Sequence, residues 1–319
     1  MPRVGVIDDY LTIARTSANW DRLPDDVSID FHQDHLTDQA ALIERLLPYD
    51  VLVIMRERTA FPRALIEQLP ALKLLITTSR RNKSVDLAAC ADHEVLVCNT
   101  EPGPTPTAEH TWALILALAK NIPEEDRTTR AGKWGMKPAI GLSGRVLGVV
   151  GLGKLGSHVA RVGKVFDMDV IAWSPNLTDA RAKEIGVTRV EKDDLMARSD
   201  FVSIHVVLSD RSRGLIGADD IARMKPTAYL INTARGPIVD EAALVAAVQR
   251  GVIAGAGIDV FGTEPLPLDD PLRNLPNSII TPHTGGFILD NYELWYRGAV
   301  EDIEAWLKGE PIRVLTSNE

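Results

Sequence analysis

The sequence has few cysteines and no long apolar run. Its 319 residues include only Cys90 and Cys98, which is too few for a disulfide scaffold and typical of a reducing compartment. No cluster of residues has the spacing of a metal site, so we expect no metal. The apolar runs are far shorter than the ~18 residues that a membrane span needs, and the first residues do not resemble a secretion signal. We therefore expect a cytoplasmic protein.

Basic residues are fewer than acidic residues in this sequence. The formal net charge is −9 at pH 7, and acidic and basic residues are interspersed along the chain. Binding to nucleic acid or to a membrane surface needs a basic face, so we expect neither kind of partner. Local basic pockets remain compatible with this composition.

Short apolar strands and helical segments alternate along the chain in two series. In the first hundred residues we expect strands at 4–7, 51–54, 74–76 and 95–98, with helices at 40–47, 62–69 and 85–91. From residue 145 we expect strands at 146–150, 169–173, 187–190, 201–204, 228–232, 253–258 and 278–281, with helices at 154–166, 178–185, 218–224 and 240–250. Such alternation is typical of parallel sheets with helices on both faces. The sequence therefore predicts an α/β fold with two doubly wound parallel-sheet domains.

A stiff segment separates the two series. Residues 100–106 contain three prolines and a glycine, a composition that favours a linker between domains. Thr105 is placed to cap the helix that follows, expected at about 106–120. The polar stretch 123–144 looks irregular, and with Trp134 between two glycines it is a candidate arm for contact with a partner. The helical tail at 292–307 is expected to return to the first domain.

One glycine-rich turn carries the strongest functional signal. The apolar run 146–150 is followed by Gly151, Gly153 and Gly156, spaced as G-x-G-x-x-G, and then by a helical apolar pattern. The motif lies between a strand and a helix. There Gly151 permits a tight turn, Gly153 lets a pyrophosphate approach the backbone, and Gly156 lets the helix pack closely on the strand. The phosphates then meet unpaired N–H groups at the positive end of the helix. This stretch predicts a dinucleotide site, with NAD or NADP as the cofactor.

The residue that would select between the two cofactors is not acidic. At the end of the next expected strand, Ser174 stands where Asp or Glu would bind the adenosine ribose hydroxyls of NAD. Without that carboxylate a 2′-phosphate is not repelled, so NADP is compatible with the site. No arginine follows directly to bind such a phosphate. The choice between NAD and NADP stays open.

Three chemically suited side chains follow successive strands of the second series. Arg235, Glu264 and His283 each lie on a turn after an expected strand, at the edge where open α/β sheets bind ligands. The planar guanidinium of Arg235 can hold a carboxylate through two hydrogen bonds. A histidine side chain has an intrinsic pKa near neutral pH, so the imidazole of His283 suits proton transfer to and from a hydroxyl, and Glu264 can orient it and favour the imidazolium. The set predicts redox chemistry on a 2-hydroxy acid.

Together, these motifs resemble those of the D-isomer-specific 2-hydroxyacid dehydrogenases. The shared stretches are 151–156, 232–236, 259–261 with the Glu264–Pro265 pair, and 281–283, and the resemblance extends over nearly the whole chain. It implies a flavodoxin-like substrate-binding domain, made of residues 1–100 plus 288–319. A Rossmann-type NAD(P)-binding domain, 101–287, is then inserted into it. A homodimer is also implied, which suits the arm at 123–144.

The resemblance also implies roles for single residues. Arg235 would bind the substrate, Glu264 and His283 would be the acid–base pair, and Asp259 would face the nicotinamide carboxamide. Further residues would line the cofactor: Lys154, Leu155, Val206, Thr233, Ala234 and Gly285. At the end of the expected strand 201–204 lies His205, for which we expect packing on the cofactor side and no catalytic role.

Arginines mark the expected substrate side of the first domain. In similar enzymes, backbone groups of a loop hold the substrate carboxylate, and the corresponding loop here is 78–83, which includes Ser79. Arg80 and Arg81 stand where the family often has small residues, and Arg56 and Arg58 form a second basic strip. We hypothesise that these arginines select an acidic or phosphorylated 2-oxo acid. A basic loop exposed to solvent explains the same residues.

The resulting interpretation is an NAD(P)-dependent D-2-hydroxyacid dehydrogenase acting as a 2-oxo acid reductase, such as a glyoxylate or hydroxypyruvate reductase. Two alternatives stay open. One is a phosphoglycerate dehydrogenase. The other is a nucleotide-sensing corepressor of the same fold, which would bind the cofactor without turnover. Measuring absorbance at 340 nm with a panel of 2-oxo acids distinguishes the enzyme from the sensor.

Overall fold

The computed structural model describes residues 1–316 except 79, 81, 105 and 136. The chain divides into two compact units, which we describe separately. Unit 1 comprises residues 1–104 and the segment from 288 onward, and unit 2 comprises residues 105–287. The expected helix cap at Thr105 lies outside the described residues. In the part of the chain that is described, no helix combines the length and apolar character that a membrane span requires.

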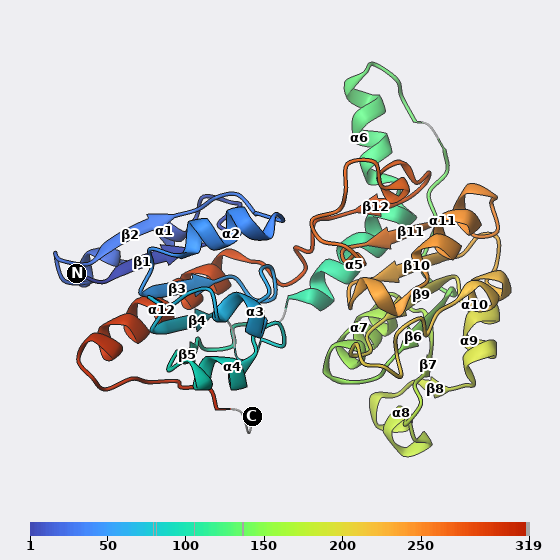
Figure 1. The fold of residues 1–319 in the computed structure, drawn as a ribbon. Helices are drawn as coiled ribbons and strands as arrows, with labels where there is room; N and C mark the ends of the chain where they lie inside the picture. Colours follow the sequence, from blue (N-terminus) through green and yellow to red (C-terminus); the bar gives the residue numbers. More distant parts are fainter. Residues whose placement is uncertain (79, 81, 105, 136, 317–319) are drawn as a thin grey trace. The chain divides into compact units, whose positions relative to one another are not determined.

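Unit 1 is built on a five-stranded parallel sheet in the order β2-β1-β3-β4-β5 (Figure 1). Its strands are β1 (Arg3–Val6), β2 (Ser28–Phe31), β3 (Val51–Ile54), β4 (Leu74–Thr77) and β5 (Leu96–Asn99). This is the order of flavodoxin-like sheets, as predicted. The edge strand β2 was not predicted. Its residues alternate between polar and apolar and are only half-buried, so no continuous apolar run marks it.

The described part of unit 1 also contains five α-helices and one 3₁₀ helix. They are α1 (Ala14–Ser17), the 3₁₀ helix η1 (Trp20–Arg22), α2 (Gln39–Leu46), α3 (Arg63–Ile66), α4 (Leu87–Asp92) and α12 (Leu289–Leu307). Asp38 and Asp86 cap α2 and α4 by accepting a backbone N–H from the first turn. The long helix α12 buries Trp295 and Tyr296 and packs against α1, β4 and β5.

A buried ion pair fastens the segment after α12. Asp302 on α12 is fully buried, and the guanidinium of Arg313 donates to Asp302 Oδ1 (2.9 Å), Glu301 Oε2 (2.9 Å) and the Gly298 carbonyl (2.8 Å). The Arg313 carbonyl in turn accepts from the backbone N–H of Asn99 on β5. Burial raises the pKa of Asp302 to about 7, although the Arg313 charge opposes this shift. One guanidinium thus joins three groups of α12 to the segment that follows it.

Unit 2 is built on a seven-stranded parallel sheet in the order β12-β11-β10-β9-β6-β7-β8 (Figure 1). Its strands are β6 (Val146–Val150), β7 (Asp169–Trp173), β8 (Thr188–Arg189), β9 (Phe201–Ile204), β10 (Tyr229–Asn232), β11 (Gly255–Ile258) and β12 (Ile279–Ile280). The order reverses between β6 and β9, the first strand and the fourth. This is the Rossmann arrangement with one added strand, and the crevice at the reversal is where such sheets bind dinucleotides.

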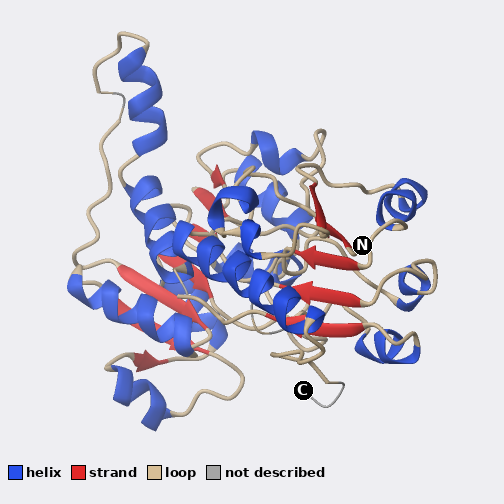
Figure 2. Cartoon of the chain, turned by 90° about the vertical axis from the view of Figure 1, so that its left-hand side faces the viewer, coloured by secondary structure: helices blue, strands red, loops and turns tan. Residues whose placement is uncertain are grey.

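Helices cover both faces of this sheet (Figure 2). They are α5 (Thr107–Ala119), α6 (Ile122–Arg130), α7 (Lys154–Val165), α8 (Asp179–Ile185), α9 (Lys192–Arg198), α10 (Ala218–Arg223), α11 (Glu241–Gln249) and the 3₁₀ helices η2 (Gly236–Ile238) and η3 (Pro271–Asn274). Two apolar cores result, one on each side of the sheet.

The prediction that 123–144 is irregular was wrong at its start, because α6 occupies residues 122–130. This helix has almost no apolar face, so no hydrophobic periodicity marks it. Ion pairs one turn apart support it, Arg127 with Glu124 and Arg130 with Asp126. Figure 2 shows α6 and the loop after it extending away from the rest of unit 2.

Candidate functional site

The glycine turn between β6 and α7 has the geometry that a pyrophosphate needs. Gly151 has φ +98°, and a Cβ there would lie 2.8 Å from the carbonyl carbon of His205. A Cβ on Gly156 would overlap the Gly151 carbonyl, so the helix packs on the strand only because both residues lack side chains. Among the described residues beyond its chain neighbours, none has an atom within 4 Å of a Cβ placed on Gly153. The approach to the helix N-terminus is therefore open.

The start of α7 supplies donors for that approach. The helix begins after Gly153 without a side-chain cap, which leaves backbone N–H groups of its first turn, at Lys154 and Leu155, available to a phosphate. These residues fit the diphosphate of NAD or NADP. Beside the turn, His205 accepts or donates a hydrogen bond with Ser203 Oγ (2.8 Å). Burial lowers the pKa of His205 to about 4, so the imidazole stays neutral and adds no charge near the phosphates.

The expected ribose side lies at the end of β7. Ser174 is half-buried, and its carbonyl accepts the backbone N–H of Leu177 (3.1 Å). Arg189 on β8 donates to the Leu177 carbonyl (3.0 Å) and so fixes the same turn. Val206 follows β9 and is half-buried. The parts that these residues take in cofactor binding stay predictions.

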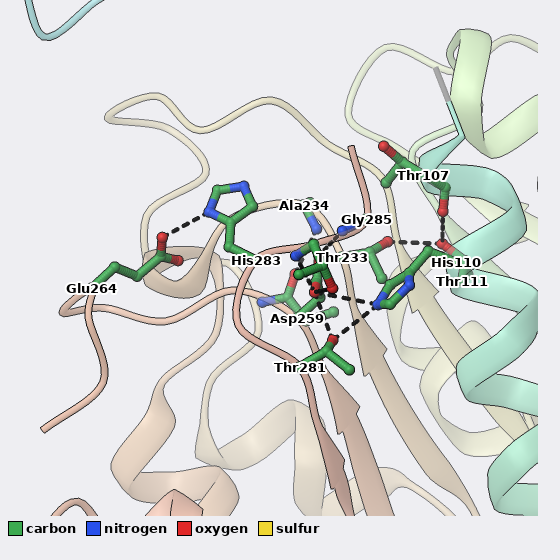
Figure 3. A network of polar contacts seen from close by, with 12 residues as sticks. Thr107, His110, Thr111, Thr233, Ala234, Asp259, Glu264, Thr281, His283 and Gly285 are labelled. Atoms are coloured by element: carbon green, nitrogen blue, oxygen red, sulfur yellow. Dashed lines mark hydrogen bonds and ion pairs between the residues drawn. The ribbon is translucent and has the colours of Figure 1, made fainter. Parts of the chain in front are cut away.

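His283 and Glu264 lie together after β12 and β11. His283 Nδ1 is 2.7 Å from Glu264 Oε2, and Glu264 Oε1 accepts the backbone N–H of Phe261 (2.9 Å). Figure 3 shows the two side chains pointing toward one another. Because the carboxylate can only accept, Nδ1 carries the hydrogen and Nε2 is left for proton exchange with another molecule. Both side chains are about one third exposed, so a ligand can reach them.

A second carboxylate fixes the loop that carries His283. Asp259, at the end of β11, is 1% exposed. It accepts from the Thr281 hydroxyl (2.6 Å) and from the backbone N–H groups of Thr284 and Gly285 (both 2.8 Å). These bonds lie on both sides of His283, which has φ +54°. Burial alone would raise the pKa of Asp259, but its hydrogen bonds outweigh burial and lower that pKa, so the carboxylate stays ionised. Its expected role toward the nicotinamide stays a prediction.

Sequence reasoning missed His110 as part of this network. His110 on α5 places Nε2 2.9 Å from Thr281 Oγ1 and 3.2 Å from Asp259 Oδ1 (Figure 3). Its partner Thr281 is 171 residues further along the chain. No local pattern around His110 could reveal that contact, which depends on how α5 packs on the sheet.

The turn after β10 presents Arg235. The Asn232 side chain donates to the Arg235 carbonyl and accepts the Ala234 N–H (both 3.0 Å), while Arg235 Nη1 donates to the Ala234 carbonyl (2.7 Å). The next residue, Gly236, lies against the Phe261 backbone so closely that a Cβ would overlap it. The backbone N–H of Phe261 also donates to Glu264, so the turns that carry Arg235 and Glu264 are in contact.

Thr233 is held from the neighbouring helix. Its hydroxyl is 2.8 Å from that of Thr111 on α5, which in turn donates to the Thr107 carbonyl (Figure 3). With Ala234, it forms the start of the turn that leads to Arg235. The predicted contact of Thr233 and Ala234 with the cofactor stays a prediction.

In unit 1, two of the predicted substrate-side arginines end up in different environments. Arg58 donates to the Asp8 carbonyl (2.7 Å) and lies over the Tyr10 ring (4.2 Å), which are contacts within the unit. Arg56 follows β3 with φ +50°, and its backbone N–H donates to Thr78 Oγ1 (2.9 Å).

Arg80 follows β4 and is exposed. Its carbonyl accepts a hydrogen bond from the side chain of Asn99 (2.9 Å). Arg56 and Arg80 thus both follow the C-terminal ends of adjacent parallel strands. The predicted residues Ser79 and Arg81 lie outside the described part of the chain.

Comparisons with known proteins agree with this geometry. Residues 112–285 match the family described as D-isomer specific 2-hydroxyacid dehydrogenase, NAD binding domain. A D-3-phosphoglycerate dehydrogenase of Synechocystis sp. is 38% identical over 250 residues, which cover 77% of this chain and 45% of that protein. A glyoxylate reductase of Korarchaeum cryptofilum is 35% identical over 277 residues, which cover 84% of this chain and 83% of that protein.

A solved structure extends the likeness to the whole chain. The structure of a putative D-3-phosphoglycerate dehydrogenase oxidoreductase from Ralstonia solanacearum superposes with a TM-score of 0.92 at 34% identity, covering 99% of this chain and 97% of that one. By contrast, this chain spans about half the length of the curated phosphoglycerate dehydrogenases that it matches.

Proposed function

The chain belongs to the D-isomer specific 2-hydroxyacid dehydrogenase family, and from this premise we propose that it transfers a hydride between NAD(P)H and a small 2-oxo acid or D-2-hydroxy acid. The observation that carries the proposal is the 2.7 Å hydrogen bond between His283 and Glu264. It joins turns after two neighbouring strands of a dinucleotide-binding sheet. Reduction of glyoxylate or hydroxypyruvate is the reaction that we favour.

The chemistry divides between the protein and the dinucleotide. When bound, the nicotinamide supplies or accepts the hydride. His283 Nε2 gives a proton to the substrate oxygen during reduction and takes it back during oxidation. Glu264 holds the ring through Nδ1 and stabilises the imidazolium form by its negative charge. The guanidinium of Arg235 binds the substrate carboxylate and orients the carbonyl carbon.

A substrate panel tests this function. The full chain is incubated with NADH or NADPH and with glyoxylate, hydroxypyruvate, pyruvate or a phosphorylated 2-oxo acid, and the absorbance at 340 nm is followed. We expect turnover of at least one acid. Binding of the dinucleotide with no turnover of any acid would instead support the nucleotide-sensing alternative.

We also propose that Arg80 binds the second acidic group of those 2-oxo acids that carry one, such as a phosphorylated acid, which would extend the substrate range beyond glyoxylate and hydroxypyruvate. Support comes from the exposed position of Arg80 after β4 and from relatives named D-3-phosphoglycerate dehydrogenase. Arg80→Ala should lower kcat/KM for a phosphorylated 2-oxo acid by about tenfold or more, because a charge-assisted hydrogen bond is lost. The value for glyoxylate, which lacks a second anion, should not change.

The matched control for this prediction is Arg63→Ala. Arg63 is an exposed arginine of unit 1 that pairs with Asp92, and its removal changes the net charge equally. If kcat/KM for the phosphorylated acid is the same in Arg80→Ala and the unaltered enzyme, the arginine is a solvated surface residue and the substrate proposal is wrong.

A homodimer is the assembly that we propose. It is supported by Trp134, which is 92% exposed in the loop that follows α6. Buried aromatic anchors commonly dominate interfaces, so Trp134→Ala should weaken dimerisation by about 30-fold or more. Analytical ultracentrifugation over a concentration series measures this, with Leu268→Ala, another highly exposed apolar residue of unit 2, as the control. Equal dissociation of both variants would contradict the role of Trp134.

The location that we propose is the cytoplasm. Cys90 and Cys98 are both buried free thiols, and burial raises the pKa of each to about 12. They therefore stay protonated and unreactive. Buried thiols of this kind suit a reducing compartment.

A further inference from the structure

A guanidinium lies beside the glycine turn, on the side of the expected ribose. Arg181 on α8 places Nη2 3.3 Å from the Ser157 hydroxyl, and that hydroxyl donates to the Leu152 carbonyl (3.2 Å). Leu152 lies inside the glycine turn itself. Arg181 is therefore only two hydrogen bonds away from the backbone that faces the phosphates.

Packing holds α8 in this position. Leu177, Ala182 and Ile185 share an apolar core with Leu152, so the helix and the glycine turn are parts of one packed body. The Thr178 side chain caps α8 by accepting the backbone N–H of Arg181 (3.2 Å). The arginine is thus held by a rigid element directly after the turn that begins at Ser174.

The charge at the end of β7 permits an anion. The turn 174–178 contains no carboxylate. The first carboxylate after it, on Asp179, is exposed and lies 3.9 Å from the guanidinium of Arg189, which partly balances its charge. Arg181 pairs with Glu184 at 2.7 Å, but the two side chains are 39% and 66% exposed. Exposed pairs of this kind contribute little to stability. The guanidinium can therefore exchange this carboxylate for a phosphate, which it binds through two hydrogen bonds.

We propose that this protein prefers NADP(H) to NAD(H), and that Arg181 binds the 2′-phosphate. The preference has two causes. Ser174 brings no carboxylate to the end of β7, and Arg181 on α8 brings a guanidinium. In dinucleotide-binding sheets, an acidic residue at the end of the second strand selects NAD, whereas a nearby arginine accommodates the 2′-phosphate. The proposal rests on the proposed function, because it assumes the dinucleotide site.

Equilibrium binding tests the proposal without any turnover. NADPH and NADH are titrated into the full chain, and Kd is measured from quenching of tryptophan fluorescence. We expect NADPH to bind at least about tenfold more tightly than NADH, because NADH lacks the 2′-phosphate and so cannot form the charge-assisted hydrogen bond to Arg181. Raising the ionic strength should reduce this ratio, since the Arg181 side chain is 39% exposed and salt screens its charge.

Arg181→Ala should weaken NADPH binding by about tenfold or more and leave the Kd for NADH unchanged. Arg250→Ala is the matched control, because Arg250 is an exposed arginine at the end of α11 whose loss changes the net charge equally. Adenosine 2′,5′-bisphosphate and 5′-AMP serve as competitor fragments, and only the first should lose affinity for Arg181→Ala. A loss of the same size for both dinucleotides would assign Arg181 to structure and overturn the proposal.

Ser174→Asp provides an independent measurement. The new carboxylate should repel the 2′-phosphate and accept the ribose hydroxyls, so the preference should reverse toward NADH. Equal binding of NADPH and NADH by the unaltered chain would overturn the NADP(H) proposal and leave the dinucleotide site intact. If neither dinucleotide binds, the proposed function fails as well, so the two failures are distinguishable.

Discussion

Replacing His283 with alanine should lower kcat by about 10²–10⁴-fold, the usual contribution of a positioned acid–base group. Among the described residues, His283 is the only one whose side chain is seen to bond to Glu264. Without the imidazole, no side chain held by Glu264 can exchange a proton with the substrate. Kd for the dinucleotide should not change, because the glycine turn lies at another part of the sheet. Stopped-flow measurement of a single turnover with a fixed 2-oxo acid gives the chemical rate directly.

Two further variants sharpen this prediction. Glu264→Gln keeps a hydrogen-bond acceptor for His283 Nδ1 but removes the charge that stabilises the imidazolium, so its rate should lie between those of the unaltered enzyme and His283→Ala. His93→Ala is the control, since His93 is exposed at the end of α4. A rate for His283→Ala within twofold of the control would remove the imidazole from the mechanism.

Arg313→Ala should cost about 3–5 kcal/mol of the free energy of unfolding, because it leaves the fully buried Asp302 without its ionic partner. Urea unfolding at several pH values measures this. Arg22→Ala is the matched control: Arg22 pairs with Glu304 on the same helix but is half exposed, so its loss should cost at most about 1 kcal/mol.

The cost of Arg313→Ala should grow with pH. The pKa of Asp302 in the folded chain, about 7, lies above the ~3.9 of an unfolded aspartate. Asp302 therefore contributes fully to the free energy of unfolding only below the unfolded pKa of ~3.9, where it is protonated in both states. This contribution is lost as pH rises through the folded pKa of about 7. Without Arg313 the folded pKa rises further, so the two proteins should diverge most above pH 7. Adding Asp302→Asn to Arg313→Ala should abolish the divergence, and a cost independent of pH would contradict this account.

The buried strands were predictable from the sequence because they are mostly apolar runs. The bounds of β3, β6 and β9 are those expected at 51–54, 146–150 and 201–204. Among the elements that were missed, β2 is a half-buried edge strand, and α6 is held by ion pairs on a polar surface. The alternation of β2 covers only four residues, too few to stand out in the sequence, and α6 has no apolar face that periodicity could detect.

The same division holds for the candidate site. Glu264 and His283 could be expected to meet because both follow strands of one parallel sheet, whose carboxyl ends share an edge. The contacts of His110 with Thr281 and of Arg181 with Ser157 could not be expected. Each joins a helix to a segment far away in sequence or across a packed core, so it depends on helix orientation, which local sequence does not determine.

Unit 1 is assembled from two segments on either side of residues 105–287. During translation it therefore cannot be completed until the ribosome has synthesised unit 2 and the segment that follows it. At about 5–20 residues per second, the ribosome needs roughly ten to forty seconds to synthesise the intervening unit. Throughout that interval the surface of β4 and β5 that α12 later covers stays bare on the nascent chain. The backbone edge of β5, with which residues 313–315 later pair, is unpaired for the same time, and an unpaired strand edge can pair with other chains. A chaperone that shields the emerging N-terminal segment should therefore raise the yield of native protein.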